Sequence, residues 1–355
     1  MTNKKLIVLS AVAVIMIMLT VIQSYQSHRP GRSKTMDIPL IQGLDTAAID
    51  KISLGSPDNM ITLKKEDKQF YLVDKDNYPA STQKINNLLT SSFEIHVSEL
   101  VTDNPGNFKD LDITEETAKS IIKFFDNEDK LITEILVGKR DEAAKGDYVR
   151  LISMDPDASQ KAFLSLNVPS LDMDAIAYLD NQLFKTEKQA ISKVTVSGPE
   201  GTYTISSGDD NKITLENIPK GKKVTGKVYE DVFTAATDLT FNDVVKDSDL
   251  AGKLDFNTTY TCFLKDSGVY TFRLAEQDDK TYVKGTSDYT DKTPVRVKTG
   301  GGESDEELKE KEAKLLVREA SLNFNKEHNG WVYQIPNWKA GNMTKKLSDL
   351  LADNK

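Results

Sequence analysis

The residues that most often carry catalysis or bind metals are few in this chain, and none is placed as such chemistry requires. His28 falls in a polar segment, His96 on the polar face of a predicted strand, and His328 in a predicted hairpin turn. None of the three has a second ligand at helical or hairpin spacing, so no metal site is predicted. The single cysteine, Cys262, lies in the apolar run Tyr260 to Leu264, where a thiol behaves as a small core hydrophobe.

Phosphate and acyl chemistry lack their usual motifs. Gly138-Lys139-Arg140 and the glycines at 300–302 do not form a P-loop, and neither a dinucleotide-binding fingerprint nor a nucleophile elbow follows a predicted strand. Carboxylates are so frequent that a pair of them says nothing about glycosidase-type hydrolysis, and the Asp-rich turns miss the spacing of a calcium loop. We therefore predict no catalytic residue, no cofactor, no nucleotide and no metal.

Three aromatic residues near the C-terminus are the candidate surface for a partner. Trp331, Tyr333 and Trp338 surround Pro336 and could line a site for a peptide or a glycan. Aromatic residues at alternate strand positions are more often part of a core. Both interpretations follow from the spacing.

The chain is acidic, which argues against nucleic acid as a partner. It has 46 Lys and Arg against 55 Asp and Glu, and only Lys4 and Lys5 are charged among the first 22 residues, so the rest carries 44 − 55 = −11. A nucleic-acid binder needs a basic stripe that neutralises phosphates, and the sequence contains none. Acidic clusters such as 126–129 and 277–279 lie between β-rich runs and are explained as hairpin turns.

The segment Leu6 to Ile22 is seventeen residues long and contains no charge. At ~1.5 Å per residue it would span about 26 Å, close to a ~30 Å hydrocarbon core. A buried helix of a soluble protein would have a polar face, and this segment has none. A cleaved signal peptide would have a shorter apolar region and a small-residue exit, whereas the exit here is Gln23-Ser24-Tyr25. We predict an uncleaved transmembrane anchor, with a cleaved signal as the alternative.

Charge alone does not fix the orientation of this anchor. Arg29, Arg32 and Lys34 after the segment balance Lys4, Lys5 and the terminal amine before it. The short N-terminal tail and the large C-terminal body favour an N-terminus in the cytoplasm and a body on the far side.

The predicted fold class is α+β, with an N-terminal transmembrane helix followed by two tandem repeats of β-hairpin, helix and antiparallel strands. The anchor covers residues 1–22 and a polar tether covers 23–37. The first α+β unit covers residues 38–185 and the second covers 186–355, which suits a chain longer than one average domain.

Within the first unit, the pattern of apolar residues places a hairpin and then a helix. Strands are expected around Ile52, over Met60 to Leu63 and over Phe70 to Val73. Pro79 then precedes a helical run through Ile85 to Leu89. Further strands are expected over residues 120–125, 131–137 and 148–152, with Asp-rich turns between them.

The second unit reads as a repeat of the first. Ile52-Ser53-Leu54 parallels Val194-Thr195-Val196 at an offset of 194 − 52 = 142, and Leu111-Asp112-Ile113 parallels Leu254-Asp255-Phe256 at 254 − 111 = 143. Tyr148-Val149-Arg150 parallels Tyr282-Val283-Lys284 at 282 − 148 = 134. Near-constant offsets predict a duplicated domain.

A partial third copy is expected at the C-terminus. Leu322 to Phe324, a turn through Gly330 and Trp331 to Tyr333 would form a hairpin, followed by a helix from Thr344 to Leu351. Before it, Glu303 to Ala320 is a charged helix. Its irregular apolar spacing favours a solvated helix over the second unit, with a coiled-coil partner helix as the alternative.

These features resemble the DUF 4340 family of uncharacterised bacterial membrane-anchored proteins. The resemblance rests on the anchor, Tyr78-Pro79 before a helix, Val137-Gly138-Lys139 followed by Tyr148 to Arg150, and the ending Asn329 to Pro336. It implies a single-pass protein of the bacterial inner membrane whose bulk is periplasmic or extracytoplasmic. It also implies a place beside ABC transporters of the gliding-motility type, without an ATPase of its own and with no catalytic residues to carry over.

The predicted function is therefore a non-enzymatic, membrane-anchored accessory protein that binds a transporter subunit or an envelope substrate. An envelope hydrolase with acidic catalytic residues among the turns is the alternative. Its predicted partners are the membrane, through Leu6 to Ile22, and a protein, but neither nucleic acid nor nucleotide.

Overall fold

A computed structural model describes residues 37–141, 143, 146–208, 210–295 and 304–353. Strands make up 42% of the structure and helices 25%, so the protein is mostly β-sheet. The chain divides into two compact units. Unit 1 contains the chain up to Tyr71 together with Ala80–Met173, and unit 2 contains Leu72–Pro79 together with Asp174–Lys355.

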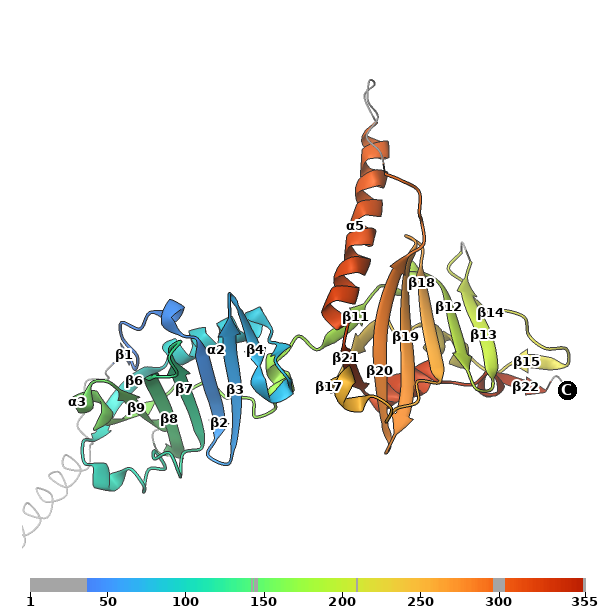
Figure 1. Cartoon of the computed structure of the whole chain (residues 1–355). Helices are drawn as coiled ribbons and strands as arrows, with labels where there is room; N and C mark the ends of the chain where they lie inside the picture. Colours follow the sequence, from blue (N-terminus) through green and yellow to red (C-terminus); the bar gives the residue numbers. More distant parts are fainter. Residues whose placement is uncertain (1–36, 142, 144–145, 209, 296–303, 354–355) are drawn as a thin grey trace, which may run out of the picture. The chain divides into compact units, whose positions relative to one another are not determined.

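Unit 1 is built on a ten-stranded sheet in the order β1-β6-β10-β9-β8-β7-β2-β3-β4-β5 (Figure 1). The strands pair antiparallel from β1 to β3. Their bounds are β1 (Ile38–Pro39), β2 (Lys51–Ser56), β3 (Asn59–Glu66), β4 (Gln69–Leu72), β5 (Tyr78–Pro79), β6 (His96–Thr102), β7 (Ser120–Phe125), β8 (Leu131–Asp141), β9 (Gly146–Ser153) and β10 (Ala162–Ser165).

Both faces of the unit 1 sheet are covered. The helix α2 (Thr82–Phe93) lies on one face, where the ring of Phe93 is 5.7 Å from that of Phe124. The segment 103–119 lies on the other face, where Phe108 and Ile113 form a buried cluster with residues of β7, β8 and β10. A one-turn helix, α3 (Pro156–Ser159), connects β9 to β10. Two apolar layers therefore enclose this sheet.

Unit 2 is built on an eight-stranded sheet in the order β14-β13-β12-β18-β19-β20-β21-β17, antiparallel throughout. Its strands are β12 (Ile191–Gly198), β13 (Gly201–Ser207), β14 (Ile213–Leu215), β17 (Asp243–Lys246), β18 (Thr258–Leu264), β19 (Gly268–Gln277), β20 (Lys280–Tyr289) and β21 (Trp331–Ile335). Two small ribbons pair β11 (Gln182–Lys185) with β16 (Asp238–Thr240) and β15 (Lys222–Val224) with β22 (Leu351–Asp353).

The helices of unit 2 pack on one face of its sheet. The helix α4 (Val228–Phe233) accepts a hydrogen bond at the Val232 carbonyl from the Tyr260 hydroxyl at 2.8 Å. The long helix α5 (Asp305–His328) brings Phe324 to 5.2 Å from the Tyr270 ring. A third helix, α6 (Asn337–Met343), contacts α4. Gly285 makes the close approach of α5 possible, because a β-carbon there would lie 2.9 Å from the Phe324 ring.

The two sheets share one strand order. Each strand of one series has a counterpart with the same neighbours in the other. The series is β6-β10-β9-β8-β7-β2-β3-β4 in unit 1 and β17-β21-β20-β19-β18-β12-β13-β14 in unit 2. The register agrees as well, since Leu136 pairs with Arg150 in unit 1 and Arg273 pairs with Lys284 in unit 2. The two units are therefore copies of one topology.

The predicted fold class needs correction in two respects. The α+β assignment is wrong because sheet dominates both units and several expected helices are single turns or loops. The partial third copy is also wrong. Leu322 and Phe324 lie inside α5, and β21 is the counterpart of β10, so the C-terminal strand completes the second unit. The expected helix over 344–351 is instead a 3-10 turn, η7 (Leu347–Leu350), followed by β22.

The predicted transmembrane arrangement is corrected too. Leu6 to Ile22 lies outside the residues that the structure describes, and in the described ranges no helix is long and apolar enough to cross a membrane. The longest helix among the described residues, α5, has 24 residues but is rich in Glu and Lys. The single-pass localisation therefore has no spanning helix in the described part of the chain to support it.

Candidate functional site

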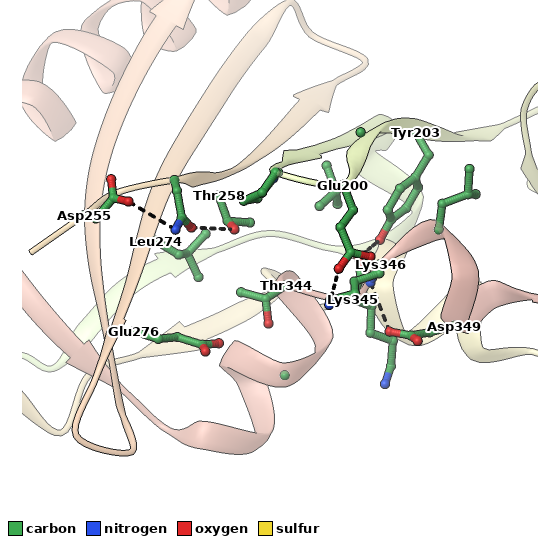
Figure 2. Close-up of a pocket in the computed structure, with 17 residues that line it drawn as sticks. Glu200, Tyr203, Asp255, Thr258, Leu274, Glu276, Thr344, Lys345, Lys346 and Asp349 are labelled. Atoms are coloured by element: carbon green, nitrogen blue, oxygen red, sulfur yellow. Dashed lines mark hydrogen bonds and ion pairs between the residues drawn. The ribbon is translucent and has the colours of Figure 1, made fainter.

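The candidate site is a pocket of about 420 Å³ in unit 2. It lies where the β12–β13 turn, the start of β18 and the end of β19 meet the segment that joins α6 to η7 (Figure 2). Its apolar lining includes Val196, Leu274 and Tyr203, which are all buried. The pocket therefore has an apolar base and a polar rim.

Hydrogen bonds and a tight turn fix two of the pocket walls. Gly198 and Gly201 pair at the end of the β12–β13 hairpin, and Gly201 has a φ of 124° that other residues rarely adopt. On the opposite wall, the Tyr203 hydroxyl donates to the Lys345 carbonyl at 2.7 Å. The Lys346 amide donates to the Asp349 carboxylate at 3.1 Å, which holds the chain as it enters η7.

The charges at the rim are arranged asymmetrically. Lys346 forms an ion pair with Glu200, and this hydrogen bond raises the pKa of the Lys346 ammonium. Figure 2 shows the Asp255 and Glu276 carboxylates on the other side of the pocket, away from this pair. Asp255 accepts a 3.4 Å hydrogen bond from the Asn257 side chain. The rim therefore offers carboxylates on the side where no lysine lines the pocket.

The aromatic residues singled out in the sequence do not form one surface. Tyr333 is fully buried, Trp331 is half-buried beside Tyr78, and Trp338 on α6 is 66% exposed. Only Trp338 is therefore fully available to a partner, with the Lys339 ammonium 4.6 Å from its ring centre.

Tyr333 belongs to a buried chain of hydrogen bonds. Its hydroxyl lies 2.7 Å from Nδ1 of His328 and 3.4 Å from the Tyr78 hydroxyl. Burial lowers the pKa of His328 to about 4 and raises the pKa of Tyr333. His328 was expected in a turn but is the last residue of α5. Its helical spacing from Ser321 and Phe324, the other two buried residues of α5, could have predicted that it lies in a helix.

The other candidate residues are structural or exposed. Cys262 is fully buried, as predicted, and burial raises the pKa of its thiol to about 12. His96 is partly exposed and bonds to Asp37 at 2.6 Å, whereas His28 lies outside the described residues. No group of three or more potential metal ligands occurs within the described ranges.

One buried charge in unit 1 was missed by the sequence reasoning. Glu134 is 1% exposed and forms a 3.3 Å ion pair with Lys123, which also bonds to Glu115 at 2.8 Å. Desolvation raises the pKa of the Glu134 carboxyl. No motif surrounds this residue, so only the register of β7 against β8 shows that it faces Lys123.

The architecture is thus a duplicated antiparallel-sheet protein with a mixed polar and apolar pocket in its second unit. The chain matches the family described as a domain of unknown function, DUF4340, over residues 71–258. This match covers just over half of the 355 residues, and the chain belongs to that family. Comparisons with curated proteins and with solved structures found no match.

Proposed function

We propose that this protein is a non-enzymatic accessory protein and that the unit 2 pocket receives a basic side chain of a protein partner. The observation that carries the proposal is the charge asymmetry of the pocket rim. Glu200 neutralises Lys346 on one side, while Asp255 and Glu276 line the other side above an apolar base.

A lysine or arginine side chain fits this combination of surfaces. Its aliphatic stem would lie on Leu274 and Tyr203, and its charged end would reach the carboxylates at the rim. Charge-assisted hydrogen bonds of this kind are about twice as strong as neutral ones. Because the walls are held by hydrogen bonds between side chains and the backbone, little ordering would be needed on binding.

The resemblance described above suggests the class of partner. A subunit of an ABC-type transport system would suit an accessory protein that provides binding and leaves nucleotide chemistry to the transporter. This part of the proposal rests on the family resemblance and on the pocket chemistry together.

Carbodiimide crosslinking tests the proposal, because it joins a carboxylate to an amine only when the two are in salt-bridge contact. Whole cells producing the tagged full-length chain would be crosslinked, and the linked peptides identified by mass spectrometry. We expect Asp255 or Glu276 to be joined to a lysine of another protein. The double variant Asp255→Asn/Glu276→Gln should lose this product.

Asp58→Asn in the β2–β3 turn and Glu66→Gln at the end of β3, both exposed in unit 1, provide matched controls that should retain the product. If the pocket variant gave the same partner crosslinks as the parent chain, the pocket would not be the binding site. Turnover of a substrate that disappears in the same variant would instead support a hydrolase.

A further inference from the structure

A row of threonines crosses five adjacent strands of the unit 2 sheet. Successive register pairs bring these residues directly opposite one another, so their side chains share one face. Figure 1 shows the strands β13, β12, β18, β19 and β20 side by side. From β13 to β20, the row consists of Thr204, Thr195, Thr261, Thr271 and Thr286.

Further hydroxyl groups flank this threonine row. A second, parallel row lies two positions further along the strands and includes Thr202, Ser197 and Thr259. Ser206 lies on the opposite side of the threonine row. Strand spacing places neighbouring hydroxyls ~4.8 Å apart across the sheet and ~6.7 Å apart along it. Cross-strand hydrogen bonds hold two of the pairs, Thr195 with Thr204 at 3.2 Å and Ser197 with Thr202 at 2.7 Å.

In unit 2 the counterpart of the unit 1 covering segment meets this face at Lys284, whose ammonium lies 2.6 Å from Asp247 and 4.4 Å from the centre of the Phe256 ring. At the counterpart positions unit 1 has Ile121 and Leu136, which are buried under segment 103–119. Unit 2 has Thr259 and Arg273 there, so at these two positions it lacks the apolar contacts that hold segment 103–119 over the unit 1 sheet. Its helices pack on the opposite face, through residues such as Phe272 that alternate with the threonines.

Basic side chains border the threonine row on both sides, and one of them, Lys284 opposite Arg273, is already paired with Asp247. Arg273 is exposed on one side, and Lys193 lies on the other with its ammonium 4.3 Å from the centre of the Phe263 ring. This cation–π contact holds Lys193 at the edge of the row. The whole chain has a net charge of −9, whereas Arg273 and Lys193 place positive charge on this face.

We propose that this threonine face binds a polysaccharide that carries carboxylate groups. Each threonine hydroxyl can donate one hydrogen bond and accept two, which matches the hydroxyl groups of a sugar chain. Arg273 and Lys193 would bind carboxylates on either side of the row. The proposal goes beyond the protein-binding pocket, which lies on the other face of the sheet beside Val196 and Tyr203.

Affinity electrophoresis tests this proposal with defined probes. The full-length chain would migrate through native gels that contain polygalacturonate, neutral dextran or no polymer. We expect retardation by polygalacturonate alone, although the net negative charge of the chain opposes binding to a polyanion. Dextran should have no effect because it lacks carboxylates for the two cations.

Variants of the threonine face make the test specific. Thr195→Val/Thr261→Val removes two hydroxyls while keeping β-branched side chains, and it should weaken retention about fivefold. Arg273→Gln should weaken it about tenfold at low salt. Thr240→Val on β16 and Lys64→Gln on β3 are strand positions away from this face and should leave retention unchanged.

Three results would overturn the proposal. These are no retardation of the parent chain by polygalacturonate, equal retardation by dextran, and retention that the control variants reduce as much as the face variants do. Circular dichroism of every variant separates loss of binding from loss of fold. The crosslinking experiment on the pocket does not involve these residues, so either proposal can fail without the other.

Discussion

The buried histidine of unit 2 should make that unit sensitive to mild acid. His328 is 8% exposed, packs against the Phe324 ring at 4.4 Å and meets the Tyr333 hydroxyl at Nδ1. Two carboxylates act electrostatically on the tyrosines of this cluster, Glu327 of α5 and Asp180. Protonation would place a positive charge among aromatic rings, which is why burial lowers the pKa of His328.

The lowered pKa of His328 determines how the stability of unit 2 changes with pH. A base whose pKa is lowered on folding contributes stability above its unfolded pKa of 6.5, and this contribution is lost as the pH falls toward the folded value of about 4. For these two values, linkage gives a loss of about 2.5 kcal/mol between pH 7.5 and pH 4.5. The loss saturates near 3.4 kcal/mol below pH 4, which is 2.5 pKa units at 1.36 kcal/mol each.

Tryptophan fluorescence isolates this effect, because both tryptophans of the chain, Trp331 and Trp338, lie in unit 2. Urea unfolding followed by fluorescence at half-unit intervals from pH 7.5 to 4.5 gives the free energy of unfolding of this unit. The variant His328→Gln keeps a group that can accept from Tyr333 but cannot be protonated in this range, and it should show a flat profile. If the variant and the parent chain lost stability in parallel, His328 would not be the titrating group.

Three further predictions concern other buried positions. Glu134→Gln should stabilise unit 1 by about 1 kcal/mol at pH 7, because the raised pKa means that ionised Glu134 costs stability, which is regained as the pH falls through the raised pKa toward 4.5; thermal unfolding by circular dichroism checks this, with exposed Glu115→Gln giving no gain. Gly138→Ala should destabilise unit 1 by about 3 kcal/mol, since a β-carbon would lie 2.1 Å from the Leu111 carbonyl oxygen; wild-type stability in urea unfolding would contradict that contact. Cys262 should resist iodoacetamide at pH 8 in the native protein and react after denaturation, and rapid native labelling would show that its strand opens.

Sequence periodicity located many strands because their apolar residues alternate. The strands expected over 120–125, 131–137 and 148–152 coincide with β7, β8 and β9, and the helix after Pro79 is α2. Alternation does not show which strands are neighbours, so the position of β21 beside β20 could not be derived. The segment before it was misread because Leu322 and Phe324 also fit a strand, whereas Phe324 and His328 bury one side of a helix.

The candidate sites were harder to predict, because each depends on register. Asp255 and Glu276 line one pocket although they lie 21 positions apart in the chain, and no motif joins them. The threonine row likewise comes from five strands whose sequence spacing is irregular. Trp331 and Tyr333 looked alike in the sequence, but the described structure buries only Tyr333 completely.

The duplicated topology lets one scaffold serve two purposes. Core positions are apolar in both copies, as at Ile52 and its counterpart Val194, because both sheets must bury the face beneath their helices. The opposite face is free to diverge, since its strands keep their backbone hydrogen bonds whichever side chains they carry. In unit 1, Ile121 and Leu136 draw segment 103–119 onto that face and add a second core layer. In unit 2, Thr259 and Arg273 occupy the corresponding positions, so the apolar contacts that hold this layer in unit 1 are missing there.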